Sequence, residues 1–298
     1  MIDQFKVYYS RAKMMQELKF QGGSWTKEDV NDDLVWHVPI YDVVNRKYAA
    51  FSSFLEAVKL LDKDPKNNGK FFAKSKGIKD FDFVLLCYLF RLSGSGINYI
   101  PNVGGSPFMT HGFGNFWCVD HVANGVLTSK EWLKDMPEKG FCDVKGYLLP
   151  MIKGGLRNFI QLKSQSLVFS IVDHVTKNKG LGIKDVVDYG NSWLMQRGFK
   201  RQNFVLTAFA MDLAEYFPEH VDPNSDVYVG SNAKKCLKLI MPGVKHDKAL
   251  RELCEITGGY SKPMDMEDVA CDFIRYKDNF QSKHHVEANG GITYKNNL

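Results

Sequence analysis

The chain has 298 residues, of which 44% are hydrophobic, a content that can bury one large core or two modest ones. Its formal net charge of +5 is small, so a local basic patch could bind a polyanion, but the charge does not require one. No segment is apolar over the roughly 18 positions that a membrane span needs, and the N-terminus lacks the apolar region of a secretory signal. We therefore expect a globular protein with no membrane role.

The cysteines predict neither disulfides nor a metal site. No two of them form a C-x-x-C pair, and none has metal-ligand spacing with the histidines. Such a pattern is typical of reduced thiols, which indicates a cytoplasmic protein. The six residues are Cys87, Cys118, Cys142, Cys236, Cys254 and Cys271.

The first 80 residues predict two helices separated by irregular chain. Residues 1–20 have a helical pattern, and residues 47–62 place their apolar side chains on one face. The aromatic-rich stretch 25–41 between them predicts a loop or short extended pieces. Residues 63–70 contain Asp-Pro and Asn-Asn-Gly and predict a break in the chain.

A buried helix is predicted next, over residues 81–90, and a glycine-serine loop follows it. Such a loop offers backbone N–H groups and small polar side chains that could bind a phosphate. A bare Gly-Ser loop is more often only a helix stop and a turn. The polar side chains of this loop are Arg91, Ser93, Ser95 and Asn98.

Residues 100–117 contain too much Gly and Pro for a regular element and too many aromatics for a disordered linker, so we expect an ordered functional loop. His111 lies between Thr110 and Gly112, where a ligand could approach the backbone closely, although a single histidine is more often structural. The aromatic side chains could stack on a base, but packing onto the core is their commoner use.

The remaining chain predicts further helices and few strands. A glycine-containing break at 180–182 separates two of them, and the tail from residue 281 is polar and is expected to be frayed. Apolar side chains recur at helical spacing in 119–136, 144–179, 183–197, about 202–216, 233–240, 246–257 and 266–276.

The helix at 202–216 and the turn before it carry the main functional signal of the sequence. Between residues 204 and 217 few side chains are polar, so nearly the whole helix surface is apolar and the helix is predicted to be buried. Lys200, Arg201 and Asn203 gather beside the unpaired N–H groups at its start, a setting in which phosphate binds well. An ordinary solvated helix start is the alternative.

The order of elements around this turn resembles the helix-hairpin-helix DNA glycosylase fold. A helix is followed by a glycine-containing turn, a second helix and then Val221-Asp222. In that family the hairpin holds a phosphate through main-chain N–H groups, and the Val-Asp lies at the mouth of the base pocket. The match is partial, because Lys200 replaces the second glycine of the family's Gly-x-Gly. The family's Val-Asp-Thr-His is here Val221-Asp222-Pro223-Asn224, and its strand-cleaving lysine falls near Arg201 or Gln202, which puts lyase chemistry in doubt.

Motifs across residues 80–240 resemble one phage group of glycosylase-related proteins, the alpha-glutamyl/putrescinyl thymine pyrophosphorylases, or amino acid:DNA transferases, of thymine hypermodification. The motifs are Phe90 to Gly96, His111 to Asn115, Gly198 to Arg201 and Val221 to Ala233. The resemblance implies an all-α, DNA glycosylase-like helical fold with a helix-hairpin-helix element and few or no strands. It divides the chain into an N-terminal helical elaboration (1–80), a glycosylase-like helical domain (81–280) and a polar tail (281–298).

The reaction implied by this resemblance takes place on DNA that carries pyrophosphorylated 5-hydroxymethyluracil. An amine of an amino acid or polyamine attacks the exocyclic methylene carbon and displaces pyrophosphate. The base must leave the stack to be reached, which costs a few kcal/mol. The resemblance implies no resident cofactor; Mg²⁺ could assist pyrophosphate departure, but no carboxylate cluster indicates it. For a phage-encoded protein the location would be the host cytoplasm.

The same resemblance suggests roles for individual residues. Asp222 would deprotonate or hold the incoming ammonium, since an amine attacks only as its free base, and His111 would bind the pyrophosphate or the base edge. The arginine fork of Arg91, with Ser93 and Ser95, would bind pyrophosphate oxygens. Lys200, Arg201 and Asn203 would hold the DNA backbone. The predicted substrate-binding set is completed by Asn98, Asn115, Ser225, Tyr228 and Asn232.

Three other functions remain open on the sequence. A base-excising glycosylase would use Asp222 to stabilise positive charge at the sugar or to activate water, and would release free base rather than pyrophosphate. A noncatalytic DNA-binding module would keep its binding when Asp222 and His111 are replaced. A helical protein unrelated to DNA is compatible with the modest net charge and the missing hairpin glycine.

Overall fold

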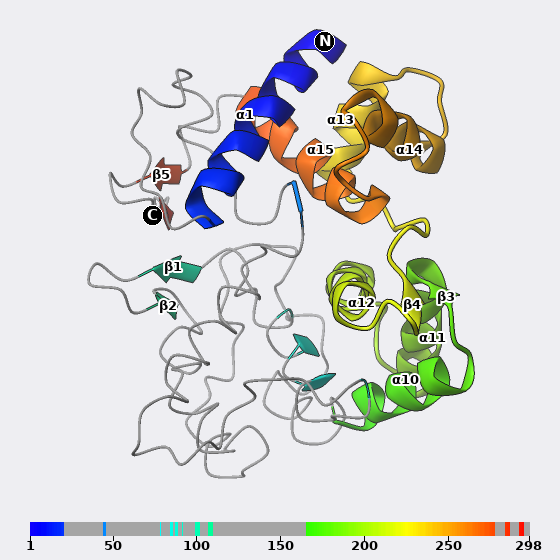
Figure 1. Ribbon diagram of the computed structural model, residues 1–298. Helices are drawn as coiled ribbons and strands as arrows, with labels where there is room; N and C mark the ends of the chain where they lie inside the picture. The colour runs from blue at the N-terminus through cyan, green and yellow to red at the C-terminus, as the bar shows by residue number, and fades with distance from the viewer. Residues whose placement is uncertain are drawn as a thin grey trace. The chain divides into compact units, whose positions relative to one another are not determined.

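A computed structural model describes 11 separate parts of the chain, the longest of which is residues 165–277 (Figure 1). All the described parts together form seven helices and only short strands, which confirms the predicted all-α class. No helix among them is both long and apolar enough to cross a membrane. The described residues are 1–20, 44–45, 78, 84–85, 87–88, 91, 99–101, 107–109, 165–277, 284–286 and 292–294.

The helices lie close to their predicted positions. Residues 84, 85, 87, 88 and 91 are helical, as expected for the segment 81–90, whereas the helices predicted at 47–62 and 119–136 lie outside the described residues. Of the helix predicted over 144–179, the described part runs from Gln165 to Lys177. The helices are α1 (Ile2–Phe20), α10 (Gln165–Lys177), α11 (Ile183–Gln196), α12 (Asn203–Tyr216), α13 (Ser231–Ile240), α14 (His246–Ile256) and α15 (Pro263–Lys277).

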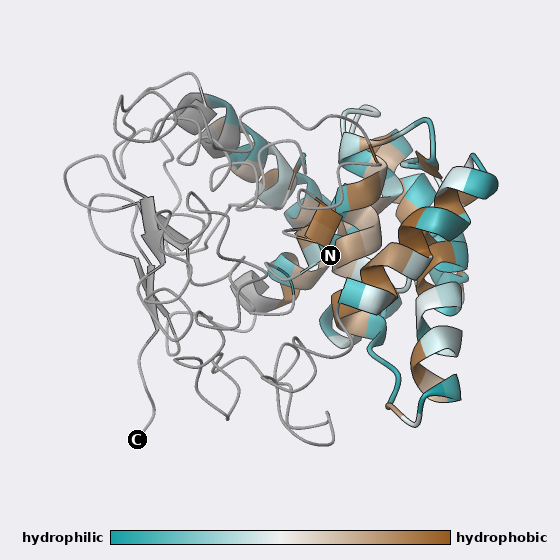
Figure 2. Cartoon of the chain, turned by 90° about the horizontal axis from the view of Figure 1, so that it is seen from below, coloured by the Kyte–Doolittle hydropathy of each residue, from teal (hydrophilic) through white to brown (hydrophobic). Residues whose placement is uncertain are grey.

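The chain forms two compact units. One consists of residues 50–223, and the other combines residues 1–49 with residues 224–298. The predicted domain 81–280 therefore contributes to both units. In each unit the hydrophobic residues of the helices, brown in Figure 2, lie mainly where helices meet, and the hydrophilic residues lie mainly outside.

In the unit of residues 50–223, α11 packs against both α10 and α12. The contact is close because Gly190 has no side chain: a Cβ atom there would lie 3.1 Å from Leu206 Cδ1 and 3.3 Å from Ile171 Cδ1. Residues 205–214 of α12 are all buried, as the nearly continuous apolar sequence predicts. A buried helix at this place holds the turn before it in a fixed position.

A two-residue parallel strand pair closes this unit. β3 (Leu181–Gly182) pairs with β4 (Val221–Asp222), with Gly182 opposite Asp222. The pairing was not predicted, since Gly180 to Gly182 is expected only to break the chain. The break and the pairing occur together because Gly180 has a positive φ of 74°, and the N–H groups of Gly180 and Leu181 both donate to the His220 carbonyl.

The other unit consists of α1 and α13 to α15 together with residues around them. Phe5 and Tyr8 of α1 pack on Phe273 of α15, with ring centroids 5.2 and 5.5 Å apart. Tyr9 Oη lies 2.8 Å from Ser261 Oγ, which in turn donates to the Val44 carbonyl at 2.6 Å. These contacts attach the N-terminal helix to α15 and to the segment before it.

Two sequence predictions about irregular segments are wrong. The segment 100–117 contains strand residues, because β1 (Tyr99–Pro101) pairs antiparallel with β2 (Pro107–Met109). Its two strand prolines face each other at the end of the ladder, where a missing N–H is tolerated. The polar tail contains β5 (His284–Val286) and β6 (Ile292–Tyr294), whose β-branched residues favour an antiparallel pair.

Candidate nucleic-acid interface

The turn between α11 and α12 is defined by the way in which α11 ends. The N–H of Phe199 donates to the Leu194 carbonyl and that of Gly198 to the Met195 carbonyl, both at 3.0 Å. This is the Schellman pattern, and it requires the left-handed conformation that Gly198 adopts with φ of 77°. The predicted Gly198 therefore fixes the end of α11 and sends the chain into residues 199–202.

The start of α12 is held by Asn191, a buried residue of α11 that is 2% exposed. Its Oδ1 accepts a hydrogen bond from the backbone N–H of Gln202 at 2.8 Å, and its Nδ2 donates to Asn203 Oδ1 at 2.7 Å. The Tyr88 hydroxyl donates to Gln202 Oε1 at 3.0 Å. The two bonds of Asn191 connect α11 to the start of α12 across the turn and so help to define the path of the residues that carry its cationic side chains.

The turn carries positive charge on its surface. Lys200 and Arg201 are exposed, and Arg201 Nε lies 3.4 Å from the Met195 sulfur. The guanidinium of Arg197 lies 3.9 Å from the ring centroid of Trp193, in a cation–π contact that holds a third cation beside the turn. The side chain of Gln202, the residue before α12, makes no capping hydrogen bond to the first turn of the helix, so the positive end of α12 adds to the potential. This arrangement can bind a phosphate.

Asp222 lies at the opposite end of α11 from the turn. It pairs through its backbone with Gly182, the residue immediately before α11, and it is partly exposed. Since α11 has 14 residues, about 21 Å of helix separates Asp222 from the basic turn. The predicted catalytic acid and the predicted backbone-binding residues therefore belong to one unit but occupy separate places in it.

Arg91 has a buried partner in the structure. Its Nε and Nη2 donate to the two carboxylate oxygens of Asp212 at 2.6 and 2.9 Å, and it is 1% exposed. The pair holds Arg91 against α12, so its predicted binding of pyrophosphate stays a prediction. Asp212 was visible in the sequence as an acid on an almost wholly apolar helix, which is a signal for a buried counter-charge, but nothing in the sequence identified Arg91 as the partner.

The other predicted substrate-binding residues are placed only in part. Ser225, Tyr228 and Asn232 belong to the unit that contains α13, and all three are partly exposed. Near them the buried Glu267 accepts a hydrogen bond from the Gly230 N–H at 2.8 Å and so caps the start of α13. Five predicted residues lie outside the described part of the chain: Ser93, Ser95, Asn98, His111 and Asn115.

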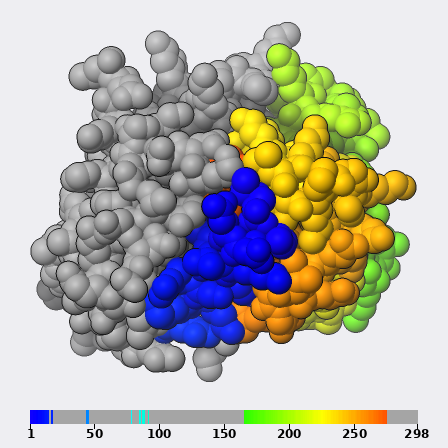
Figure 3. Space-filling view, turned by 90° about the horizontal axis from the view of Figure 1, so that it is seen from above, coloured from blue at the N-terminus to red at the C-terminus, as the bar shows by residue number. Residues whose placement is uncertain are grey.

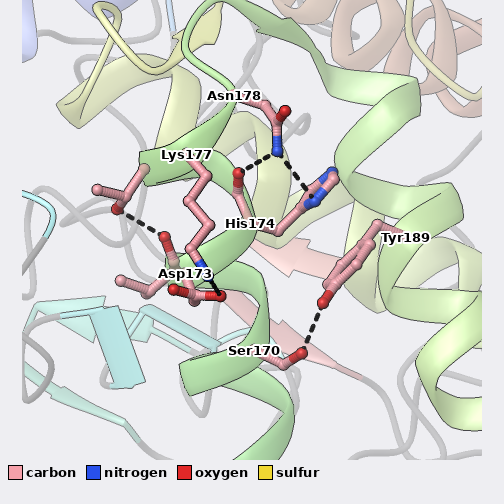
Figure 4. A network of polar contacts seen from close by, with 8 residues as sticks. Ser170, Asp173, His174, Lys177, Asn178 and Tyr189 are labelled. Carbon is pink, nitrogen blue, oxygen red and sulfur yellow. Dashed lines mark hydrogen bonds and ion pairs between the residues drawn. The ribbon is translucent and has the colours of Figure 1, made fainter.

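A second group of polar side chains, which was not predicted, joins α10 to α11 (Figure 4). Tyr189 stacks on His174 with centroids 3.9 Å apart, and its hydroxyl lies 2.7 Å from Ser170 Oγ. A hydrogen bond to Asp173 raises the pKa of the exposed Lys177. The histidine ring contacts a tyrosine ring rather than the serine hydroxyl, so the group serves to pack the two helices and has no arrangement for nucleophilic catalysis.

Metal-binding and thiol residues in the described part of the chain give no second site. Within that part no three His, Cys, Asp or Glu side chains form a group that could hold a metal ion. Four cysteines of this part form no disulfide: Cys87, Cys236, Cys254 and Cys271. Burial raises the pKa of Cys236 and of Cys254 to about 12, so both thiols are protonated and unreactive at neutral pH.

Comparison with family models, with curated proteins and with solved structures finds no match to this chain. A functional proposal therefore rests on the sequence motifs and on the basic turn between α11 and α12.

Proposed function

We propose that this protein modifies thymine bases in DNA. It would transfer an amino acid or polyamine to the methylene carbon of pyrophosphorylated 5-hydroxymethyluracil and release pyrophosphate. The observation that carries the proposal is the glycine-ended turn between two packed helices, with Lys200 and Arg201 exposed beside the start of α12. The specific chemistry rests on the motif resemblance, since the turn itself supports DNA binding of a more general kind.

The turn is suited to a phosphate of the DNA backbone. Two exposed cations and the positive end of α12 act together on a single negative group. Asn191 keeps the Gln202 N–H bound to protein, so the phosphate would be bound by the two cationic side chains at the positive end of α12. Contacts of this kind position DNA without reading its sequence.

The distance between the turn and Asp222 sets where on the DNA each would act. About 21 Å of helix corresponds to about six base-pair steps of duplex along one strand. The turn would therefore hold the backbone several nucleotides away from the base that is modified. This separation suits an enzyme that flips its target nucleotide out of the duplex. Contacts to the backbone several nucleotides away do not prevent the target nucleotide from leaving the stack.

Asp222 would act on the amine. In the proposed step the nitrogen lone pair forms a bond to the methylene carbon, the carbon–oxygen bond to pyrophosphate breaks, and pyrophosphate leaves with the electron pair. The partly exposed carboxylate of Asp222 would take the proton that the nitrogen loses, or hold the ammonium before that proton is lost. The same carboxylate would serve a glycosylase, so the product decides between the two activities.

The test uses the purified chain, DNA that contains pyrophosphorylated 5-hydroxymethyluracil, and a mixture of amino acids and polyamines. We expect an amine-bearing thymidine in the digested DNA and an equal amount of pyrophosphate. Asp222→Asn should abolish the product while DNA binding is kept, and a Lys200→Ala/Arg201→Ala double variant should weaken binding. A Lys177→Ala/Lys179→Ala variant removes the same charge from exposed positions away from the turn and serves as the control.

Other products would assign another function. Free base with an abasic site would identify a glycosylase. Tight DNA binding without any change to the bases, and equal binding by Asp222→Asn, would identify a noncatalytic binding module. Equal DNA binding by the double variant and its control would remove the turn from the DNA interface, and with it the observation that carries the proposal.

A further inference from the structure

Helix α13 has a basic outward face that none of the predicted sites includes. Ala233, Cys236 and Leu237 form its buried face, and α13 packs most extensively against α15. Its exposed residues lie three and four positions apart along the opposite side of the helix, which carries no acidic residue. They are Ser231, Lys234, Lys235, Lys238 and Leu239, and we call the three lysines the α13 lysine surface.

The lysines of this surface have no ion-pair partner among the residues that the structure describes. The cations of the neighbouring helix α14 differ in this respect, because Lys248 lies 3.4 Å from Glu252 and Arg251 lies 2.7 Å from Asp226. The α14 cations are thus neutralised within the protein, whereas the positive charge of α13 is left to solvent or to a partner.

Two buried acidic side chains of the neighbouring helix α15 accept backbone hydrogen bonds. Glu267 of α15, the helix packed against α13, is buried and accepts the N–H of Gly230. Asp265 of the same helix accepts the N–H of Lys262 at 2.8 Å and is also buried. Neither carboxylate forms an ion pair with Lys234, Lys235 or Lys238, so the three clustered cations give this face of α13 a positive potential.

We infer that the α13 lysine surface binds the sugar-phosphate backbone of DNA. Lys234 and Lys238 are separated by four residues, or about 6 Å along the helix, so three cations fall within a short length of a charged strand. Lysine contacts phosphate as a point charge, without base recognition. The inference takes DNA as the polyanion from the proposed function, but it needs neither the α11–α12 turn nor Asp222.

An anionic membrane would be the other polyanion, and the helix is poorly suited to it. A helix that lies in a membrane interface inserts an exposed apolar face. In α13 the apolar face is buried in the protein core. Among the described residues of this helix, Leu239 is the only large apolar side chain that is exposed. Figure 3 shows the residues coloured yellow to gold, which include α13 and α14, on the visible surface.

The test compares three variants of the full chain. The first is Lys234→Ala/Lys235→Ala/Lys238→Ala, which removes the surface and keeps the helix, because alanine has the highest helix propensity. The second, Lys177→Ala/Lys179→Ala/Lys248→Ala, removes the same charge from other exposed positions. The third is Lys200→Ala/Arg201→Ala at the turn. Circular dichroism confirms folding, and fluorescence anisotropy measures affinity for a duplex oligonucleotide across a salt series.

We expect the α13 variant to bind at least tenfold more weakly, with a slope of log K against log salt reduced by about 2 to 3, since each phosphate contact contributes about 0.9. The second variant should keep the slope of the unmodified protein. An unchanged slope in the α13 variant overturns the inference. If the turn variant still loses affinity in that case, the proposed function stands; if neither variant changes binding, both fail.

Loss of binding to vesicles with 30% phosphatidylserine, without loss of binding to DNA, would also overturn the inference and assign the surface to a membrane. A reduced slope for the α13 variant together with an unaffected turn variant would support the inference and remove the turn from the DNA interface.

Discussion

Helices α12 and α13 differ in where their charged side chains lie. In α12 ten consecutive residues, 205–214, are buried, and the one charged residue among them, Asp212, forms an ion pair with Arg91 inside the protein. In α13 the lysines lie on the exposed face and have no partner among the described residues. Removing one partner of the buried pair therefore leaves an uncompensated charge inside the protein, whereas the unpaired surface lysines of α13 are available for binding. Predictions about the two helices should differ accordingly.

The largest effect is expected from the buried pair. Asp212→Ala removes the carboxylate from the Arg91 guanidinium and should lower the free energy of unfolding by about 3 to 5 kcal/mol. Urea denaturation measures this. An Arg91→Met/Asp212→Leu double variant should recover much of the loss, because an apolar pair leaves no uncompensated charge.

The matched control is the exposed pair of Arg251 with Asp226, whose side chains are 48% and 40% exposed. Asp226→Ala should cost about 1 kcal/mol or less, since water screens and replaces that interaction. Equal losses for Asp212→Ala and Asp226→Ala would show that burial does not determine how much an ion pair matters for the stability of this protein.

Much of this contrast could be predicted from sequence. The apolar circumference of residues 204–217 predicts a buried helix, and α12 is buried. Periodic patterns also locate α11, α13 and α14 to within a few residues, since hydrophobic spacing and glycine stops are local signals. The Gly198 turn was predicted for the same reason.

What could not be predicted depends on contacts between distant parts of the chain. Arg91 and Asp212 are 121 residues apart, and no local pattern selects one arginine as the partner of a buried acid. The pairing of β3 with β4 involves two residues on each side, too few for a strand pattern. The bridging function of Asn191 depends on the path of the turn, which brings the Gln202 N–H to its side chain.

A smaller effect is expected at the glycines that end α11 and α14. Gly198 and Gly258 both have positive φ, 77° and 93°, and no atom lies within 4 Å of the place that a Cβ would take, so alanine adds only backbone strain. Each Gly→Ala variant should lose about 1 to 2 kcal/mol in urea denaturation. Each Gly→Asn variant should lose less, because asparagine tolerates this conformation.

The two glycines differ in their expected effect on DNA binding, because only the turn at Gly198 carries the proposed DNA contacts. Gly198→Ala should also weaken DNA binding, since it displaces Lys200 and Arg201, whereas Gly258→Ala should leave DNA binding unchanged at temperatures where both variants are folded. Equal affinities for the two variants would separate the α11–α12 turn from DNA binding.

The smallest effect concerns the buried thiols of α13 and α14 at alkaline pH. Burial raises the pKa of Cys236 and Cys254 from 9.0 to about 12. Below pH 9 the thiols are protonated in the folded and the unfolded chain alike, so they give no pH dependence. Above pH 9 the unfolded chain loses these protons while the folded chain keeps them, so the free energy of unfolding should fall as pH rises toward 12.

A Cys236→Ala/Cys254→Ala variant tests this assignment, because the loss of stability with pH should be less steep in it than in the unmodified protein. Urea denaturation at a series of pH values from 8 to about 11 measures the two slopes. Cys271→Ala is the control, since it removes a partly exposed thiol that belongs to neither α13 nor α14. Identical slopes in all three proteins would mean that α13 and α14 do not bury their thiols, and the inward face assigned to α13, opposite its lysines, would then be wrong.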